Sequence, residues 1–377
     1  MKLRNTRDAK MIFGIIIITV LLSCNNDKTT QTTQTDMKDT IATEKPITLK
    51  PAGPAPAWAP SIKPEMQVVM EKLATLGGKP IETLEGAEAR LQPTPTDAVK
   101  EVMAENNIPV PPAKCDIINK DIPVTGGTTN IRIYTPKTGT APFPVIVYYH
   151  GGGWVIGDID VYNAGAQGLC EQVGAVVVSV EYPKGPEKKF PAAHMVSFDA
   201  YQWVIANAAS IKGDAAKIAV VGESAGGNLA ANMSIMARDK KITIPLFQVL
   251  VYPVANNDMK SASYTKFADA KPLSKAMMGW FVKNALSSEA QAADPRISLV
   301  KANLAGLPKT LIIGAEIDPL QTEGALLNDK LNAAGVSSEY KLYEGVTHEF
   351  FGMAAVVPQA KEAQALAASK LKAAFGL

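Results

Sequence analysis

The sequence predicts an α/β protein whose main domain is built on an eight-stranded, mostly parallel sheet with helices on both faces and a helical cap. Apolar, strand-like runs alternate with helical stretches along the later part of the 377-residue chain, which is typical of a parallel sheet. The first two runs lie too close together for an intervening helix, so we expect them to pair antiparallel. The eight runs are Ile117–Val124, Asn130–Tyr134, Val145–Tyr149, Ala175–Tyr182, Lys217–Val221, Leu246–Tyr252, Thr310–Ala315 and Glu339–Tyr343.

The composition is that of a globular protein with a sizeable core. Hydrophobic residues make up 47% of the chain and charged residues 20%. The formal net charge is only +2 and the sequence has no basic patch, which argues against nucleic-acid binding. It also lacks a His, Cys and carboxylate cluster at metal-ligand spacing and a phosphate-binding Gly-x-Gly-x-x-Gly after a strand. We therefore expect neither a metal nor a cofactor.

A candidate nucleophile lies in the segment Gly222–Gly227, which reads Gly-Glu-Ser-Ala-Gly-Gly and fits Gly-x-Ser-x-Gly. In that motif a sharp strand-to-helix turn holds the serine above the sheet, and small neighbours relieve crowding of the backbone. A strand-like run precedes the segment here, and an Ala/Met-rich helical stretch, Asn228–Arg238, follows it. This context favours Ser224 as a nucleophile over the alternative, a glycine-rich turn with a bystander serine.

A glycine-rich loop follows an earlier strand-like run. Its sequence, His150–Trp154, is His-Gly-Gly-Gly-Trp. Three successive glycines are costly in backbone entropy, but they allow N–H groups to point at a bound oxygen with no side chain in the way. We therefore expect Gly151, Gly152 and Gly153 to form an oxyanion-binding loop rather than a simple strand-end turn.

The chain has three histidines from which a general base could be drawn. His150 belongs to the glycine loop, which we expect it to brace by hydrogen bonding. His194 lies at the start of a long helix, where we expect no chemistry. His348 follows the last strand-like run and occupies a loop, and we therefore assign it as the base.

The acid that orients this imidazole is expected at Asp318, directly after the strand-like run Thr310–Ala315. The order Ser224, Asp318, His348 is the order that a hydrolase of this architecture requires. Glu316 and Glu323 are alternatives. Because a proline follows it, Asp318 could also act only as a helix N-cap.

With these motifs the chain resembles the bacterial hormone-sensitive-lipase-like esterases, the family IV group of the α/β-hydrolases. The resemblance covers roughly residues 58–377 and rests on several spaced motifs. Besides the glycine loop and the nucleophile segment, these are Glu181–Glu187, Phe190–Ala193, Asp294–Ser298, Leu307–Pro308, Ala315–Glu316 with Asp318–Leu320, and His348–Phe350.

The resemblance implies a site and an activity. Ser224, Asp318 and His348 would form a catalytic triad. The backbone amides of Gly152, Gly153 and Ala225 would be the oxyanion donors, with Gly151 adjoining. The implied activity is that of a cofactor-independent serine carboxylesterase, which hydrolyses small short-chain acyl esters through an acyl-enzyme intermediate.

The chain departs from the family pattern in three places. Glu223 stands where the nucleophile motif more often has Asp, and Glu349 follows the histidine where Gly is frequent. Lys184-Gly185 replaces the usual Leu-Ala. We expect these departures to affect substrate preference and pH optimum more than the type of reaction.

Two segments, about 60–107 and 253–286, fit no strand–helix unit, and we call them the cap segments. Each carries apolar residues at helical spacing. The resemblance implies that they fold over the serine as a cap, whereas the simpler alternative is that their apolar faces pack on the main domain. The residues are Met66, Val69, Met70 and Leu73 in the first segment, and Met277, Met278, Trp280 and Phe281 in the second.

The N-terminus resembles a bacterial lipoprotein signal. A basic start precedes twelve mostly apolar residues, too few to span a membrane, and the lipobox-like Leu-Leu-Ser-Cys then ends at Cys24. We expect residues 1–23 to be a signal peptide, Cys24 to carry lipid, residues 24–57 to be a disordered tether and residues 58–377 to be the hydrolase domain. This implies an enzyme anchored through Cys24 to a membrane of the bacterial cell envelope. An ordinary secreted protein is the alternative.

The two remaining cysteines, Cys115 and Cys170, could pair in an oxidising envelope, but we expect two separate buried thiols. Two further functions remain open. One is an acetyl or feruloyl esterase acting on polysaccharide. The other is a non-catalytic ligand-binding protein of the same fold, as in plant gibberellin receptors, which have lost the catalytic histidine. Retention of His348 favours an enzyme.

Overall fold

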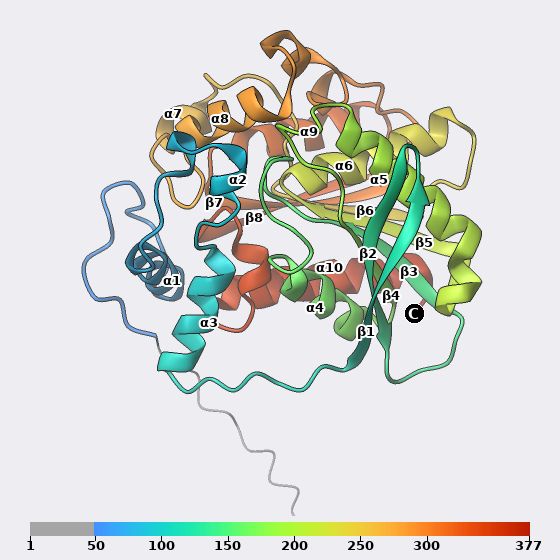
Figure 1. Cartoon of the computed structure of the whole chain (residues 1–377), viewed down its shortest axis with the longest axis horizontal. Helices are drawn as coiled ribbons and strands as arrows, with labels where there is room; N and C mark the ends of the chain where they lie inside the picture. The colour runs from blue at the N-terminus through green and yellow to red at the C-terminus, as the bar shows by residue number, and fades with distance from the viewer. Residues whose placement is uncertain (1–48) are drawn as a thin grey trace, which may run out of the picture. The chain divides into compact units, whose positions relative to one another are not determined.

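A computed structural model describes residues 49–377, which contain one eight-stranded sheet (Figure 1). The strand order is β1-β2-β4-β3-β5-β6-β7-β8. The first two strands pair antiparallel, as does β2 with β4, and every later pairing is parallel. The predicted fold class is confirmed, and each strand overlaps one predicted run. The strands are β1 Cys115–Val124, β2 Gly127–Pro136, β3 Phe143–Tyr149, β4 Val176–Val180, β5 Gly213–Glu223, β6 Phe247–Val251, β7 Lys309–Ile317 and β8 Ser338–Thr347.

Helices connect the parallel strands and cover both faces of the sheet (Figure 1). The α-helices are α1 Pro64–Thr75, α2 Gly86–Ala89, α3 Pro95–Glu105, α4 Asn163–Val173, α5 Ala192–Asn207, α6 Ala225–Asp239, α7 Ala262–Lys266, α8 Lys275–Ala285, α9 Gln321–Ala333 and α10 Pro358–Phe375. The 3₁₀ turns are η1 Ile81–Thr83, η2 Ala208–Ile211, η3 Glu289–Ala293, η4 Leu299–Lys301 and η5 Phe350–Met353.

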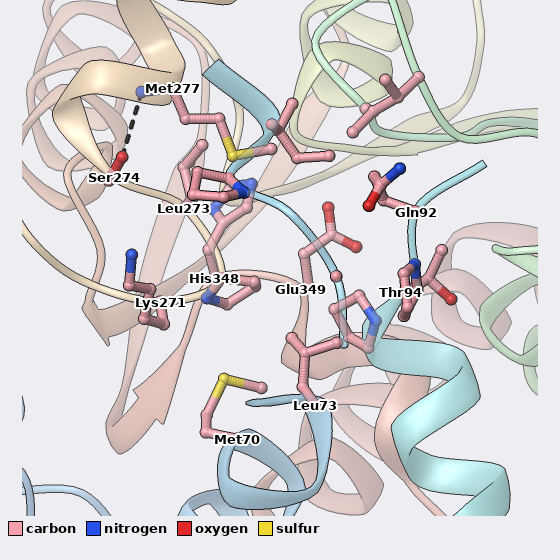
Figure 2. A pocket seen from close by; sticks show the side chains of 18 of the residues that line it. Met70, Leu73, Gln92, Thr94, Lys271, Leu273, Ser274, Met277, His348 and Glu349 are labelled. Atoms are coloured by element: carbon pink, nitrogen blue, oxygen red, sulfur yellow. Dashed lines mark hydrogen bonds between the residues drawn. The ribbon is translucent and has the colours of Figure 1, made fainter. Parts of the chain in front are cut away.

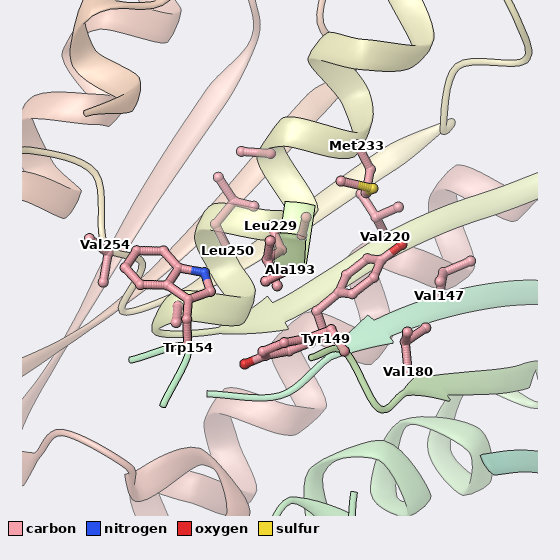
Figure 3. Close-up of a cluster of buried hydrophobic side chains, with 14 of the residues drawn as sticks. Val147, Tyr149, Trp154, Val180, Ala193, Val220, Leu229, Met233, Leu250 and Val254 are labelled. Carbon is pink, nitrogen blue, oxygen red and sulfur yellow. The ribbon is translucent and has the colours of Figure 1, made fainter. Parts of the chain in front are cut away.

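Two hydrophobic cores lie on opposite faces of the sheet because successive strand residues point to opposite sides. Val147 and Tyr149 of β3 belong to the core shared with α5, α6 and α9, whereas Ile146 and Tyr148 belong to the core shared with α1, α3, α4 and α10. Figure 3 shows Val147, Tyr149 and Leu229 of α6 among the side chains of the first core. Burial on both faces explains why β3 is a continuous apolar run.

The cap segments are helical, as expected. The first contains α1, η1, α2 and α3, and the second contains α7 and α8. They contact each other, because the indole N–H of Trp280 donates a hydrogen bond to the carbonyl oxygen of Leu84 at 2.9 Å. Met66 and Val69 of α1 are buried in the core that also contains Ile146 and Tyr148, so packing on the main domain accounts for that face of the helix.

The ordered domain begins before residue 58, where the tether was expected to end. Leu49 is buried, and the Gln67 side chain of α1 donates hydrogen bonds to the carbonyl oxygens of Gly53 and Pro54 at 2.9 and 3.1 Å. Residues 49–57 therefore pack on the domain partly through their backbone, and Leu49 is the one residue among them whose side chain is buried. The expected signal peptide, Cys24 and the rest of the tether lie outside the described residues.

Cys115, at the start of β1, and Cys170, in α4, are both buried free thiols. Among residues 49–377, no helix combines the length and the apolar character needed to cross a membrane.

Candidate active site

Ser224 occupies the sharp turn between β5 and α6. Its backbone has φ 55° and ψ −117°, a conformation that costs a non-glycine residue roughly 1–3 kcal/mol. The Ser224 N–H donates to the carbonyl oxygen of Val251 at 2.8 Å, which fixes the turn to β6. Gly226 passes so close to β3 that a Cβ there would lie 2.0 Å from the carbonyl oxygen of Tyr149. The glycine of the motif therefore makes this close approach possible.

The structure brings Ser224, His348 and Asp318 into one hydrogen-bonded chain. Nε2 of His348 lies 2.9 Å from Oγ of Ser224, and Nδ1 lies 2.6 Å from Oδ2 of Asp318. All three side chains are buried. They meet because β5, β7 and β8 are parallel, so the segments after these strands lie at the same edge of the sheet.

Asp318, rather than Glu316 or Glu323, contacts the imidazole. Its second oxygen, Oδ1, accepts a hydrogen bond from the Leu320 N–H at 2.8 Å, which orients the carboxylate from behind. Glu316 instead accepts from the Gly345 N–H at 2.7 Å, on the loop before the histidine. Glu323 accepts hydrogen bonds from the N–H groups of Ala255 and Asn256, at 2.5 and 2.6 Å, at the start of the second cap segment. The two alternative acids thus position loops around the site.

The electrostatics of this chain favour a basic imidazole. Burial lowers the pKa of His348, but the charge and the hydrogen bond of Asp318 outweigh that effect and raise the pKa above its usual value. Immediately before the serine, burial raises the pKa of Glu223 to about 7, against the opposing hydrogen bonds from Tyr148 and Tyr252. The carboxyl group next to Ser224 is therefore neutral or only partly ionised near neutral pH.

The glycine loop presents unused backbone donors. Gly152 and Gly153 have φ values of 96° and 58°, and within the described residues neither N–H group donates a backbone hydrogen bond. Ala225 is the first residue of α6, so its N–H has no acceptor within the helix. These are the three donors that the resemblance implied.

His150 braces the loop, as expected. Its Nδ1–H donates to the carbonyl oxygen of Gly151 at 2.8 Å, and its ring stacks on Tyr182 with 4.1 Å between the centroids. The Tyr182 hydroxyl also donates to the Gly151 carbonyl, at 3.0 Å. The carbonyl oxygen of Gly151 is therefore held by two side chains, His150 and Tyr182. The remaining histidine, His194, lies in the first turn of α5, where its Nε2 is 3.1 Å from Oδ1 of Asn228. It takes no part in the hydrogen bonds that join Ser224, His348 and Asp318.

Ser224 opens into a cavity of about 590 Å³ between the glycine loop and the cap segments. Figure 2 shows Met70, Leu73, Leu273 and Met277 around this cavity, together with His348. The apolar residues come from α1 and from the second cap segment, so part of each segment does form a wall over the serine. The residues that line the cavity also include Pro54, Pro56, Tyr162, Phe281 and Glu349.

Three tyrosine–carboxyl hydrogen bonds, to two glutamates, were not predicted. Tyr148 and Tyr252 donate to the two oxygens of Glu223, and Tyr162 donates to Glu349 at 2.5 Å. The sequence does contain a signal, because both glutamates stand at positions that depart from the family pattern. Their partners are distant in the chain, so spacing alone could not identify them. Within residues 49–377 no group of His, Cys and carboxylate side chains is arranged to hold a metal ion.

Comparisons with known proteins agree with this geometry. Residues 146–352 match the alpha/beta hydrolase fold family. Carboxylesterase NlhH of Mycobacterium tuberculosis is 39% identical over 249 residues, which cover 65% of this chain and 78% of that protein. Ethyl acetate hydrolase of Pseudomonas putida is 29% identical over 288 residues, 75% of this chain and 88% of that protein.

Solved structures give the same result. A thermostable esterase from Pseudomonas putida ECU1011 has a TM-score of 0.77 at 32% identity, and the match covers 85% of this chain and 99% of that one. The Pyrobaculum calidifontis esterase has a TM-score of 0.73 at 34% identity, with coverage of 83% and 98%. The chain belongs to the alpha/beta hydrolase fold family. Its predicted class, a carboxylic ester hydrolase, is confirmed by these relatives.

Proposed function

We propose that this protein is a serine carboxylesterase that hydrolyses short-chain acyl esters, with Ser224, His348 and Asp318 as its catalytic triad. The observation that carries the proposal is the continuous chain of hydrogen bonds from Oγ of Ser224 through His348 to Asp318. A purely ligand-binding protein would have no need to keep a serine hydroxyl and an imidazole in this arrangement.

The reaction follows from the positions of these atoms. Oγ of Ser224 attacks the ester carbonyl carbon while Nε2 of His348 takes its proton, and Asp318 stabilises the imidazolium. The N–H groups of Gly152, Gly153 and Ala225 bind the negative charge that develops on the carbonyl oxygen. His348 then gives its proton to the leaving alcohol. Water activated by the same imidazole hydrolyses the acyl-enzyme and restores the serine.

Replacement of the nucleophile tests this assignment. Ser224→Ala should abolish hydrolysis of p-nitrophenyl butyrate while the thermal unfolding temperature stays close to that of the wild type. Ser288→Ala, at an exposed serine before η3, is the matched control and should keep full activity. If Ser224→Ala retains a tenth of the wild-type activity or more, the nucleophile is another residue.

A preference for short acyl chains is supported by the cavity and by the relatives. The cavity of about 590 Å³ has an apolar wall but limited room, and one relative is named an ethyl acetate hydrolase. In a series of p-nitrophenyl esters we expect kcat/KM to peak between roughly C2 and C8, each methylene contributing about 0.8 kcal/mol until space runs out. Higher activity on emulsified long-chain triglyceride than on soluble butyrate would contradict this preference. Acetylated xylan and feruloyl esters in the same series test the polysaccharide-directed alternative.

We further propose that the enzyme is a lipoprotein of the bacterial cell envelope, held to a membrane by acyl chains on Cys24. The support is the lipobox-like sequence ahead of a polar tether. Several acyl chains on one cysteine would retain the protein firmly, whereas a single chain would give only marginal binding. Cys24→Ser should release active enzyme into the soluble fraction or leave an unprocessed precursor, with unchanged specific activity. A wild-type protein that is soluble and has an unmodified N-terminus would exclude the anchor and leave the esterase proposal intact.

A further inference from the structure

Glu349 places a carboxyl group in the cavity that contains Ser224. It follows His348 directly, and Figure 2 shows its two oxygens pointing into the space between Leu273 and Gln92. Oε1 accepts a hydrogen bond from the Tyr162 hydroxyl at 2.5 Å. Within residues 49–377, Oε2 accepts no hydrogen bond and the carboxyl forms no ion pair, so Oε2 is available to whatever occupies the cavity.

Glutamate is an unfavourable residue for folding at this position. Its φ is 71°, a left-handed conformation that costs a residue with a Cβ roughly 1–2 kcal/mol and that glycine adopts freely. Burial also raises the pKa of Glu349, because the charged carboxylate is poorly solvated there. Neither the left-handed backbone nor the burial of the carboxyl group helps the chain to fold. The presence of a glutamate at this position is therefore better explained by what the cavity binds.

We propose that Glu349 is a specificity-determining residue, and that its Oε2 accepts a hydrogen bond from a hydroxyl group of the substrate. This inference rests on the proposed function. The preferred substrates are then short esters that carry a hydroxyl group close to the scissile bond. A site built to bind a hydroxyl discriminates strongly against an analogue that lacks it, because the buried polar group of the site is then left unpaired. Tyr162 fixes the carboxyl by holding Oε1.

The charges of the cavity favour a neutral hydroxyl group over a cation as the partner of Glu349. Four basic and four acidic side chains line the cavity, so the lining has no net charge that would attract a cationic substrate. The basic residues are Lys79, Arg90, Lys184 and Lys271, and the acidic ones are Glu71, Glu82, Asp158 and Glu349.

Pairs of esters of equal size test the proposal. On the acyl side, ethyl 3-hydroxybutyrate is compared with ethyl 3-methylbutyrate. On the alcohol side, 2-hydroxyethyl butyrate is compared with propyl butyrate. The measured quantity is the ratio of kcat/KM for the hydroxyl ester to that for its methyl partner, obtained by titrating the released acid at constant pH.

Three variants are compared with the wild type. Glu349→Gly removes the carboxyl and relieves the backbone strain, so it should unfold at the wild-type temperature or above. It should lower the ratio at least tenfold for one of the two pairs while activity on the methyl ester persists. Glu349→Gln retains an acceptor oxygen, so its kcat/KM ratio should lie between that of the wild type and that of Glu349→Gly. Glu344→Gln changes an exposed acid on β8 and should leave both ratios unchanged.

Three results would overturn the inference. In the first, Glu349→Gly leaves both ratios unchanged. In the second, both members of each pair lose activity in parallel, which indicates a structural role. In the third, the variant loses more activity on butyrylcholine than on either hydroxyl ester, which indicates a cation site. Failure of the proposed function is distinguished from these results, because Ser224→Ala would then still hydrolyse the methyl esters.

Discussion

The ring of Tyr252 lies against the imidazole of His348, with 4.4 Å between the ring centroids, and the Tyr252 hydroxyl donates a hydrogen bond to Glu223. Tyr148 donates to the other oxygen of Glu223. Glu223 directly precedes Ser224, so one buried unit supports both the turn that carries the proposed nucleophile and the ring of the proposed base. This unit explains how a strained serine and a buried histidine can keep their relative positions.

The ring contact leads to a first prediction. Tyr252→Ala removes a fully buried aromatic ring and should destabilise the fold by roughly 3–5 kcal/mol. It should also lower kcat at least tenfold, because His348 loses the surface against which it packs. Tyr252→Phe keeps the ring and should change kcat much less. Urea unfolding and butyrate hydrolysis measure the two effects, and equal loss of kcat in both variants would show that the hydroxyl, not the ring, positions the base.

A second prediction concerns the glycine loop. A Cβ at Gly152 would lie 2.1 Å from the carbonyl oxygen of Ile156, and the φ of 96° is unfavourable for alanine. Gly152→Ala should therefore displace the backbone donors and lower kcat about 10²–10³-fold, the effect of losing one oxyanion donor. Gly279→Ala, in α8, is the control, since a Cβ there meets no atom within 4 Å. Normal turnover by Gly152→Ala would exclude this loop as the oxyanion site.

A third prediction is the pH dependence of turnover. His348 must be neutral to take the serine proton, and Asp318 raises the pKa of His348 despite the burial that lowers it. Protonation therefore begins at a higher pH than in a free histidine, and kcat/KM should fall on the acid side with a midpoint above about 6.5. Asp318→Asn removes the stabilising charge, so the His348 pKa measured by NMR should decrease. An unchanged pKa in that variant would contradict the assigned partner.

A fourth prediction links Glu223 to stability. Burial raises its folded-state pKa to about 7, above the unfolded value of about 4.3. The resulting stabilisation is fully present below the unfolded pKa and is lost as the pH rises through about 7. Glu223→Gln resembles the protonated acid and does not titrate, so its unfolding temperature should rise relative to the wild type between pH 5 and pH 8.5. Over the whole range between the two pKa values the effect corresponds to about 4 kcal/mol.

Glu344→Gln, an exposed substitution, provides the control for this pH series. Its unfolding temperature should follow that of the wild type at every pH. If the difference between Glu223→Gln and the wild type is the same at pH 5 and pH 8.5, the buried carboxyl does not titrate in this range.

The sheet could be predicted because a strand buried on both faces appears as a continuous apolar run. The predicted run Val145–Tyr149 lies within β3, and the predicted start of β5 differs only because residues 213–216 are partly exposed. The meeting of Ser224, Asp318 and His348, the proposed triad, could be predicted for a related reason: loops that follow parallel strands lie at one edge of the sheet.

Contacts between distant side chains could not be predicted in this way. Tyr148 and Glu223 are 75 residues apart, and Leu84 and Trp280 are 196 apart. Neither contact leaves a periodic pattern in the sequence. The packing of residues 49–57 was not predicted, because a short run rich in Pro and Ala is typical of a spacer. Its contacts are the buried Leu49 and backbone groups that bond to Gln67 and Glu71, and they leave no periodic pattern.

The walls of the cavity and the reacting groups come from different parts of the chain. The reacting groups follow strands of the sheet, whereas much of the wall comes from the cap segments and from Pro54 and Pro56. During evolution, substitutions in the wall can therefore change which esters fit without moving the atoms that cleave them. Exchange of α8 between two members of the family should accordingly transfer substrate preference while leaving the rate of acyl transfer on a small common ester nearly the same.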